Sequence, residues 1–163
     1  MTKADIYQFI AKQKLGVLGT LSSGGSPQSA LVGIAVTPEL EIIFDTVKNS
    51  RKFQNLMSNS GCSFVVGWTG EITVQYEGQA YQPEGAALAH YQEVYFARWP
   101  DGPSRLSWPG ITYFVVRPRW ILFRSHLRPW CSHSGTIVKV SEMATSNWSA
   151  VDKHCAVLRG YLS

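Results

Sequence analysis

The chain lacks most of the signatures that assign a protein to a class directly. Its three cysteines, Cys62, Cys131 and Cys155, form no Cys-x-x-Cys pair, so no disulfide framework or zinc finger is predicted. No charged and then apolar leader opens the sequence, which favours an intracellular, cytoplasmic protein with reduced thiols. No apolar stretch approaches the roughly 18 residues that span a bilayer, so no membrane partner is expected.

Charged residues are also sparse, at 16% of the 163 residues. The formal net charge is +4, but the 15 lysines and arginines are scattered and no run of them exceeds two. A nucleic-acid partner is therefore not expected. No Ser-His-Asp elbow, P-loop or zinc-protease motif appears, so the sequence supports neither hydrolase nor nucleoside-triphosphatase chemistry.

Hydrophobic residues, at 45%, are arranged in short periodic segments, which predicts one compact core. Thr2 and Asp5 have the spacing of a capping box, followed by apolar residues at helical spacing, so a short N-terminal helix is expected. Period-two alternation and β-branched runs predict strands elsewhere. The predicted strands cover residues 15–21, 28–36, 40–46, 62–68, 71–82, 111–116 and 120–124.

Two helices are predicted between these strands, at residues 51–59 and 83–98, with Pro83 at the start of the second. Residues 98–110 are rich in proline and glycine and are predicted to form a loop. Gly78 interrupts an alternating segment and indicates a bulge where a barrel curves. Strands that follow one another locally, with one N-terminal and two inserted helices, predict a mainly β fold built on a small antiparallel barrel.

The segment from Phe44 to Leu56 carries the strongest functional signal, because a strand runs into a polar turn that opens an amphipathic helix. Arg51 and Lys52 lie in the first turn of that helix, where the partial positive charge of the helix end disfavours cations. An anion would reverse this penalty, since free backbone N–H groups, the Ser50 hydroxyl and the two cations could bind one phosphate. A solvated helix end explains the same residues, so both interpretations stay open on this segment alone.

Two other strands support a ligand site. The strand at residues 28–36 has an unusually small second face, formed by Ser29, Leu31, Gly33 and Ala35. With the Ser-Arg-Lys turn followed by Asn55 and Leu56, and the Val-x-x-x-Gly-x-Ala strand at 74–80, the sequence resembles the pyridoxamine 5′-phosphate oxidase-like FMN-binding split-barrel superfamily over about residues 5–125.

This resemblance implies a split β-barrel of six to seven antiparallel strands with Greek-key-like connections. It also implies a homodimer with two FMN sites at the subunit interface, and a flavin-dependent oxidoreductase that acts on a small molecule. The flavin ring would lie on the small-faced strand and the phosphate at the Ser-Arg-Lys turn. Thr73 would approach the ring from the partner side, and Arg124, near a closing-strand position of the family, would contact the cofactor. The implied cofactor-binding residues are Ala30, Leu31, Val32, Gly33, Asp45, Thr46, Ser50, Arg51, Lys52, Thr73 and Arg124.

The sequence departs from the family at its C-terminus. No counterpart of the family's substrate-phosphate positions is found beyond Arg124, so vitamin B6 oxidase activity is not expected. Residues 126–163 form an atypical tail with a short helix at 149–162 that could pack on the barrel. His126, Cys131 and His133 are close in sequence, but without a second ligand pair no metal site is predicted.

The catalytic residues and the exact cofactor stay open. Tyr91, Tyr95 and Arg98, together with His90 on the same predicted helix, could line a substrate opening, but a helical core stripe that includes Leu88 explains the tyrosines better. Trp120 is interpreted as core or dimer packing. Deazaflavin or haem could occupy the same slot as FMN, and a non-catalytic protein that binds or senses flavin or haem is the alternative to an enzyme.

Overall fold

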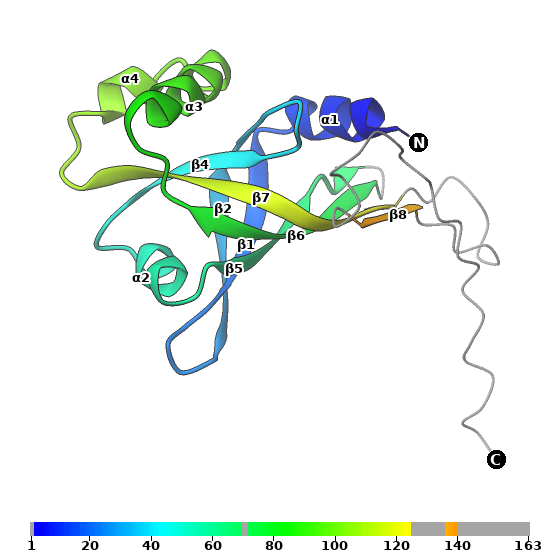
Figure 1. The fold of residues 1–163 in the computed structure, drawn as a ribbon, viewed down its shortest axis with the longest axis horizontal. Coiled ribbons are helices and arrows are strands. Elements are labelled where there is room, and N and C mark those ends of the chain that lie inside the picture. Colours follow the sequence, from blue (N-terminus) through cyan, green and yellow to red (C-terminus); the bar gives the residue numbers. More distant parts are fainter. Residues whose placement is uncertain (1, 70–71, 125–135, 140–163) are drawn as a thin grey trace.

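The computed structural model describes residues 2–69, 72–124 and 136–139 (Figure 1). The described elements alternate in the predicted way, with one helix before the first strand and others inserted between strands. In chain order they are α1 (Lys3–Lys12), β1 (Leu15–Leu21), β2 (Pro27–Gly33), β3 (Ala35–Val36), β4 (Ile42–Val47), α2 (Arg51–Ser58), β5 (Gly61–Val66), β6 (Thr73–Tyr81), α3 (Gly85–Arg98), α4 (Gly102–Arg105), β7 (Ile111–Arg124) and β8 (Thr136–Lys139).

The first helix begins at the predicted capping box. The Thr2 amide donates to Asp5 Oδ2 at 2.7 Å, and the Asp5 amide donates to Thr2 Oγ1 at 3.2 Å. These two bonds satisfy backbone donors that have no partner inside a helix. Ile6 and Ile10, four residues apart on one face, are fully buried and fix α1 to the barrel.

The strands form one antiparallel sheet in the order β2-β1-β5-β6-β7-β4-β3, and β8 pairs with β7. The two edges of this order, β2 and β3, are separated in the chain only by Ile34. The path therefore curls round so that its two ends meet, which is the predicted antiparallel split barrel with inserted helices. The chain crosses from β4 through α2 to β5, which pairs with β1, and this long connection gives the sheet its Greek-key character.

The predicted strand at 28–36 is two strands because the chain changes partners at Ile34. β2 pairs with β1, whereas β3 pairs with β4. At the change, the Ile34 amide donates to the Lys14 carbonyl at 2.9 Å, and the Ile34 carbonyl accepts from Trp99 Nε1 at 3.1 Å. The prediction of a single strand was wrong. The period-two alternation of the sequence continues through Ile34, although the strand before it pairs with β1 and the strand after it pairs with β4.

The two strands predicted at 111–116 and 120–124 form one strand, β7. The register against β6 shifts between Glu77 and Gly78, which face Trp120 and Pro118, and this leaves Arg119 as the extra residue of a bulge. The predicted irregularity at Gly78 is confirmed. A Cβ at Gly78 would lie 2.4 Å from the Arg117 carbonyl oxygen, so only glycine fits there.

Two further boundaries differ from the prediction. The third helix begins at Gly85 instead of Pro83, and Glu84 is its N-cap residue. The predicted loop at 98–110 contains the single turn α4, because Pro103 at the start of that turn has a backbone suited to a helix.

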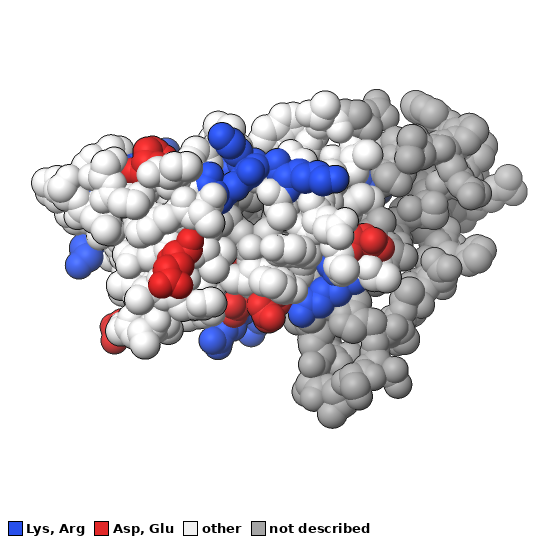
Figure 2. Space-filling view, turned by 90° about the horizontal axis from the view of Figure 1, so that it is seen from above, with Lys and Arg blue, Asp and Glu red and all other residues white. Residues whose placement is uncertain are grey.

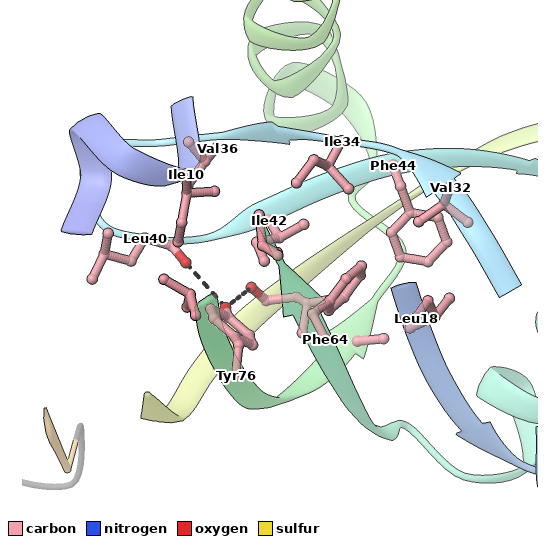
Figure 3. Close-up of a cluster of buried hydrophobic side chains, with 14 of the residues drawn as sticks. Ile10, Leu18, Val32, Ile34, Val36, Leu40, Ile42, Phe44, Phe64 and Tyr76 are labelled. Carbon is pink, nitrogen blue, oxygen red and sulfur yellow. Dashed lines mark hydrogen bonds between the residues drawn. The ribbon is translucent and has the colours of Figure 1, made fainter. Parts of the chain in front are cut away.

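The barrel encloses the larger of two apolar clusters (Figure 3). Phe44, Phe64 and Tyr76 are among its largest buried side chains, and their rings pack edge to face. The Tyr76 hydroxyl is within hydrogen-bond distance of the Leu40 carbonyl at 3.0 Å and the Val116 carbonyl at 2.6 Å. This pairing offsets the cost of burying a phenol oxygen inside the core.

The smaller cluster lies outside the barrel, between the sheet and α3. Ala35, Ile43, Val115, Tyr113 and Tyr95 are buried in it, and Leu88 and Tyr91 pack against its edge. This confirms the interpretation of the tyrosine stripe as core. Figure 1 shows α3 and α4 together above β4, while α2 lies on the lower side of the barrel.

No helix within the described ranges is long and apolar enough to cross a membrane. β8 belongs to the segment predicted to be a tail. The rest of that prediction, including the helix at 149–162 and the His126, Cys131 and His133 group, lies outside the described residues.

Candidate functional site

The predicted phosphate turn is built from the end of β4 and the start of α2. Ser50 is the N-cap residue of α2, and its hydroxyl accepts from the Phe53 amide at 3.3 Å. The same hydroxyl contacts Thr46 Oγ1 at 2.9 Å, and Thr46 is buried. Ser50 therefore starts the helix and ties it to the strand, which leaves its hydroxyl less available to a ligand than the sequence suggested.

Arg51 and Lys52 follow Ser50 in a first turn that contains no acidic residue. Neither side chain lies in any of the ion pairs found among the described residues. Arg51 is exposed, whereas Lys52 is half-buried and lies three and four residues before the buried Asn55 and Leu56. The helix thus presents two cations without a counter-ion at its positive end, an arrangement that favours an anion.

Asn55 fixes α2 to the barrel. Its Nδ2 donates to Thr20 Oγ1 at 2.9 Å and to Gln28 Oε1 at 3.0 Å, and both Asn55 and Thr20 are 6% exposed. Through these bonds α2 is tied to β1 and to the start of β2. Sequence reasoning placed Asn55 in a motif but missed its two partners. Thr20 and Gln28 precede Asn55 by 35 and 27 positions, and no local pattern links residues so far apart in the chain.

The predicted ring-binding strand presents its residues in two directions. Val32 is 7% exposed and packs in the barrel core, while Leu31, on the other face, is 60% exposed. Ala30 is half-buried. A Cβ at Gly33 would lie 2.8 Å from Trp99 Cζ2, so Trp99 of the same chain fills the space beside this glycine. On the small face of this strand, the surface near Leu31 is exposed, whereas the surface at Gly33 is covered by Trp99.

Asp45 is engaged inside the chain. Arg105 Nη1 lies 2.6 Å from Asp45 Oδ2, and the Tyr95 hydroxyl donates to Asp45 Oδ1 at 2.9 Å. Burial first, and then the Asp45 carboxylate, raise the pKa of Tyr95 well above its ordinary value, so Tyr95 stays a neutral donor. Burial alone would lower the pKa of Arg105, but the attraction of Asp45 outweighs it and raises this pKa. Both Asp45 oxygens therefore have partners without a ligand.

Thr73 and Arg124 are register partners at one end of the pair β6 and β7. Thr46 pairs with Thr112 near the opposite end of β7. Twelve residues of strand separate Thr112 from Arg124, on the order of 40 Å measured along the strand. A single chain therefore does not bring Thr73 and Arg124 to the phosphate turn.

The residues at the turn fit the phosphate of a flavin mononucleotide, since they offer two uncompensated cations and free helix N–H groups. The ring end is incomplete in one chain, because Trp99 occupies the space at Gly33 and the closing-strand residues lie far away. Any flat ring would have to lie toward Leu31 and complete its site with a second surface.

The residues predicted as candidates for a substrate opening fall into two groups, those with partners inside the chain and those that are exposed. Tyr95 is fully buried, and Tyr91 donates to Glu41 Oε2 at 2.7 Å, so both have structural partners. Arg98 Nη2 donates to the Lys12 carbonyl at 2.8 Å and ties α3 to the end of α1. His90 is exposed. Trp120 is half-buried and faces Glu77 on the outer side of the sheet, away from the barrel core.

Figure 2 shows one elongated basic group and several small acidic groups on a face that is otherwise mostly uncharged.

Solved structures with the same fold differ in what their names say they bind. A haem-binding protein from Mycobacterium smegmatis has a TM-score of 0.73 and 16% identity, with 86% of this chain and 59% of that chain covered. The haem storage protein HutZ from Vibrio cholerae has a TM-score of 0.62 and 14% identity, covering 71% and 88%. A Clostridium acetobutylicum protein related to general stress protein 26, of the pyridoxinephosphate oxidase family, has a TM-score of 0.66 and 13% identity, covering 86% and 96%.

At these identities the likeness shows the fold alone. The chain spans about three fifths of the length of the first two solved structures it matches, 59% and 57%. No curated protein sequence matches the chain significantly. The family model described as pyridoxamine 5′-phosphate oxidase, however, matches residues 2–125, which include every element from α1 to β7. The chain therefore belongs to the pyridoxamine 5′-phosphate oxidase family and has its split-barrel fold.

Proposed function

We propose that this protein binds FMN at the start of α2 and is an FMN-dependent oxidoreductase that acts on a small molecule. The observation that carries the proposal is the pair Arg51 and Lys52, two cations at the positive end of a helix that have no carboxylate partner within residues 2–69, 72–124 and 136–139. Membership of the family supports FMN over other phosphate ligands.

In this proposal Arg51 and Lys52 bind the FMN phosphate together with backbone N–H groups of the first helical turn. A hydrogen bond to a charged group contributes about 1.5 to 3 kcal/mol. Loss of one such contact should therefore weaken FMN binding by about one to two orders of magnitude. Thr46 and Ser50 hold the turn in place through their hydroxyl contact.

The ring end of the proposed site requires a homodimer. One row of residues crosses the outer face of the sheet from β2 through β1, β5 and β6 to β7. Each member is the register partner of the next: Leu31, Val17, Val65, Gln75 and Leu122. Leu31 and Val65 are 60% and 41% exposed, and neither belongs to the cluster that packs under α3. An apolar row of this kind suits a second copy of the chain.

A partner placed on this row would bring its own Thr73 and Arg124 to the site. This arrangement would unite the two groups of predicted residues that one chain keeps apart. The bound flavin would supply the hydride or electron transfer. The chain would bind the phosphate, exclude water from one side of the ring and leave the other side open to the substrate.

The proposal is tested by adding FMN to the purified protein, removing the excess and recording the visible spectrum. The wild type should keep flavin bands near about 375 and 450 nm, and Arg51→Ala/Lys52→Ala should lose them. Lys3→Ala/Lys12→Ala removes the same charge from α1 and is the matched control. A wild type that stays colourless, or a double variant that keeps its flavin, would refute the phosphate site.

A non-catalytic protein that binds or senses flavin or haem is the second candidate. Two structures of the same fold bear names that state haem binding or storage. Parallel samples with haem and with a deazaflavin phosphate decide between the ligands, since a Soret band would identify haem. Oxidation of reduced nicotinamide by the FMN-loaded protein would favour the enzyme, whereas flavin that is bound but never reduced would favour the binding protein.

A further inference from the structure

Residues 99–110 run from the end of α3 to the start of β7, and we refer to them as the strap. The strap is attached to the barrel at three points. Trp99 Nε1 donates to the Ile34 carbonyl at 3.1 Å, and Arg105 forms its ion pair with Asp45. At the far end, the Gly110 carbonyl accepts from the Lys48 amide at 2.9 Å.

The two outer attachments lie beside the two parts of the proposed cofactor site. Trp99 fills the space at Gly33 and bonds the next residue, at the end of the predicted ring-binding strand. Lys48 lies two residues before Ser50, in the turn that opens α2. The strap is therefore a bridge between the strand that would face the ring and the turn that would bind the phosphate.

The middle attachment is the ion pair. Arg105 and Asp45 are 14% and 12% exposed at their side chains, and Nη1 and Oδ2 are 2.6 Å apart. The Arg105 guanidinium also lies over the Tyr95 and Trp99 rings, with its carbon 5.6 and 5.7 Å from their centroids. Arg105 thus joins β4, α3 and the beginning of the strap at one place.

This attachment is not fully satisfied. Arg105 Nε and the hydroxyl of Tyr113 are buried and have no hydrogen-bond partner in the part of the chain that the structure describes. Tyr113 lies opposite Asp45 on β7. The second carboxylate near Arg105, Asp101, is 65% exposed and 3.3 Å away, so it contributes little. Buried donors without partners cost free energy. The pair with Asp45 is the charged one of the three attachments described above, and it lies between the other two along the strap.

We propose that Arg105 is a positioning residue: through Asp45 it holds the strap closed and so sets the spacing between the phosphate turn and the ring-facing strand. The part that concerns cofactor affinity rests on the proposed function, whereas the part that concerns the strap does not. The family resemblance implied that Asp45 borders the flavin. In this proposal Asp45 instead acts through Arg105, without direct contact with the flavin.

The experiment compares Arg105→Gln with Arg117→Gln. Arg117 pairs with Glu41 at 3.2 Å beside α3 but away from the strap. Its side chain is 66% exposed, against 14% for Arg105, so its variant removes a more exposed arginine–carboxylate pair from the same half of the sheet. Hydrogen exchange is followed by NMR at the Lys48 amide, with the Val74 amide in the core as a measure of global opening. We expect exchange at Lys48 to become about tenfold faster or more in Arg105→Gln and to stay unchanged in Arg117→Gln.

FMN affinity gives the second readout. Arg105→Gln should weaken FMN binding by about tenfold, and saturating FMN should slow Lys48 exchange in the wild type, because coupling between sites is reciprocal. Asp45→Asn should have the same effect as Arg105→Gln, and the double variant should be no worse than either. An additive double variant would show that Asp45 contacts the ligand directly and would overturn the positioning role.

Unchanged exchange at Lys48 in Arg105→Gln would overturn the strap itself. Faster exchange with unchanged FMN affinity would leave the strap standing and refute its role in the site. A wild type that binds no FMN refutes the proposed function and the affinity part together, while the exchange comparison still decides the strap. If Arg105→Gln does not fold, Arg105→Lys replaces it, since lysine keeps the charge but lacks the planar group over the two rings.

Discussion

The outer surface of the sheet has two halves with the same alternating pattern and different covers. On β3, β4 and the first half of β7, the outward residues Ala35, Ile43 and Val115 are 6%, 0% and 0% exposed because α3 packs on them. On β2 and β5, the outward residues Leu31 and Val65 are 60% and 41% exposed. The sequence of the strands does not distinguish the two halves; the helix inserted between β6 and β7 does.

This difference shows which half of the outer sheet surface the chain buries with its own residues. The covered half is a second core that the chain completes with its own helix and strap. The uncovered half keeps an apolar row that ordinary surface positions do not need. In the proposed homodimer, the second copy does for this half what α3 does for the other. Substitutions that act on one half and spare the other test this interpretation.

The largest effect is expected from a buried charge in the covered half. Val115→Asp places a carboxylate with no partner at a fully buried position, which should cost at least about 3 kcal/mol and prevent stable folding. Val65→Asp makes the same change at a position that is 41% exposed, so the monomer should fold. Circular dichroism and thermal unfolding measure the first effect, and sedimentation measures whether the second abolishes self-association.

Equal loss of folding in both variants would contradict the comparison, because it would mean that the uncovered half is already buried in the monomer. A Val65→Asp protein that folds and still associates as the wild type does would instead place the interface elsewhere. Val65→Thr, which keeps the shape without a charge, is the matched control for the second variant.

The local patterns in the sequence predicted much of the barrel. The capping box at Thr2, the bulge at Gly78, and the turn and helix that follow β4 all depend on residues close together in the chain. Each of these features is decided by hydrogen bonds or steric limits within a few residues or within one pair of strands, so spacing alone indicates them.

The features that sequence reasoning missed are contacts between distant residues. Asp45 was expected to border a flavin, which stays a prediction, and its partner Arg105, 60 residues away in the chain, was missed. The small face at Gly33 was interpreted as room for a ring, but Trp99 fills it. A small or charged residue indicates that something packs against it or pairs with it, and only the fold decides whether that partner is a ligand or the chain itself.

A middle-sized effect is expected at α2, where two amide bonds from Asn55 tie the helix to the barrel. Asn55→Ala removes both amide bonds and leaves the buried Thr20 hydroxyl without this partner, which should lower the free energy of unfolding by about 1 to 3 kcal/mol. Chemical denaturation measures this loss.

Gln54→Ala, at an exposed position on the same helix, is the control and should change stability by less than about 0.5 kcal/mol. If the Asn55 variant lost no more stability than this control, the amide bonds would not anchor α2 to the barrel.

The smallest effect is expected from the tyrosines of the covered half at high pH. Burial, followed by the nearby Asp45 charge, raises the pKa of Tyr95 and of Tyr113 above the ordinary value of 10.0. In the unfolded chain these tyrosines ionise near pH 10, so their contribution to stability is complete below that pH and is lost as the pH rises beyond it. Between pH 8 and pH 10.5 the loss should be less than about 1 kcal/mol per tyrosine. Urea unfolding at the two pH values measures it, and Tyr95→Phe and Tyr113→Phe should each remove part of the pH dependence. A pH dependence that survives both substitutions would assign it to other tyrosines with a raised pKa, namely Tyr91 at the edge of the same cluster or Tyr76 in the barrel core, and Tyr91→Phe would then separate the two.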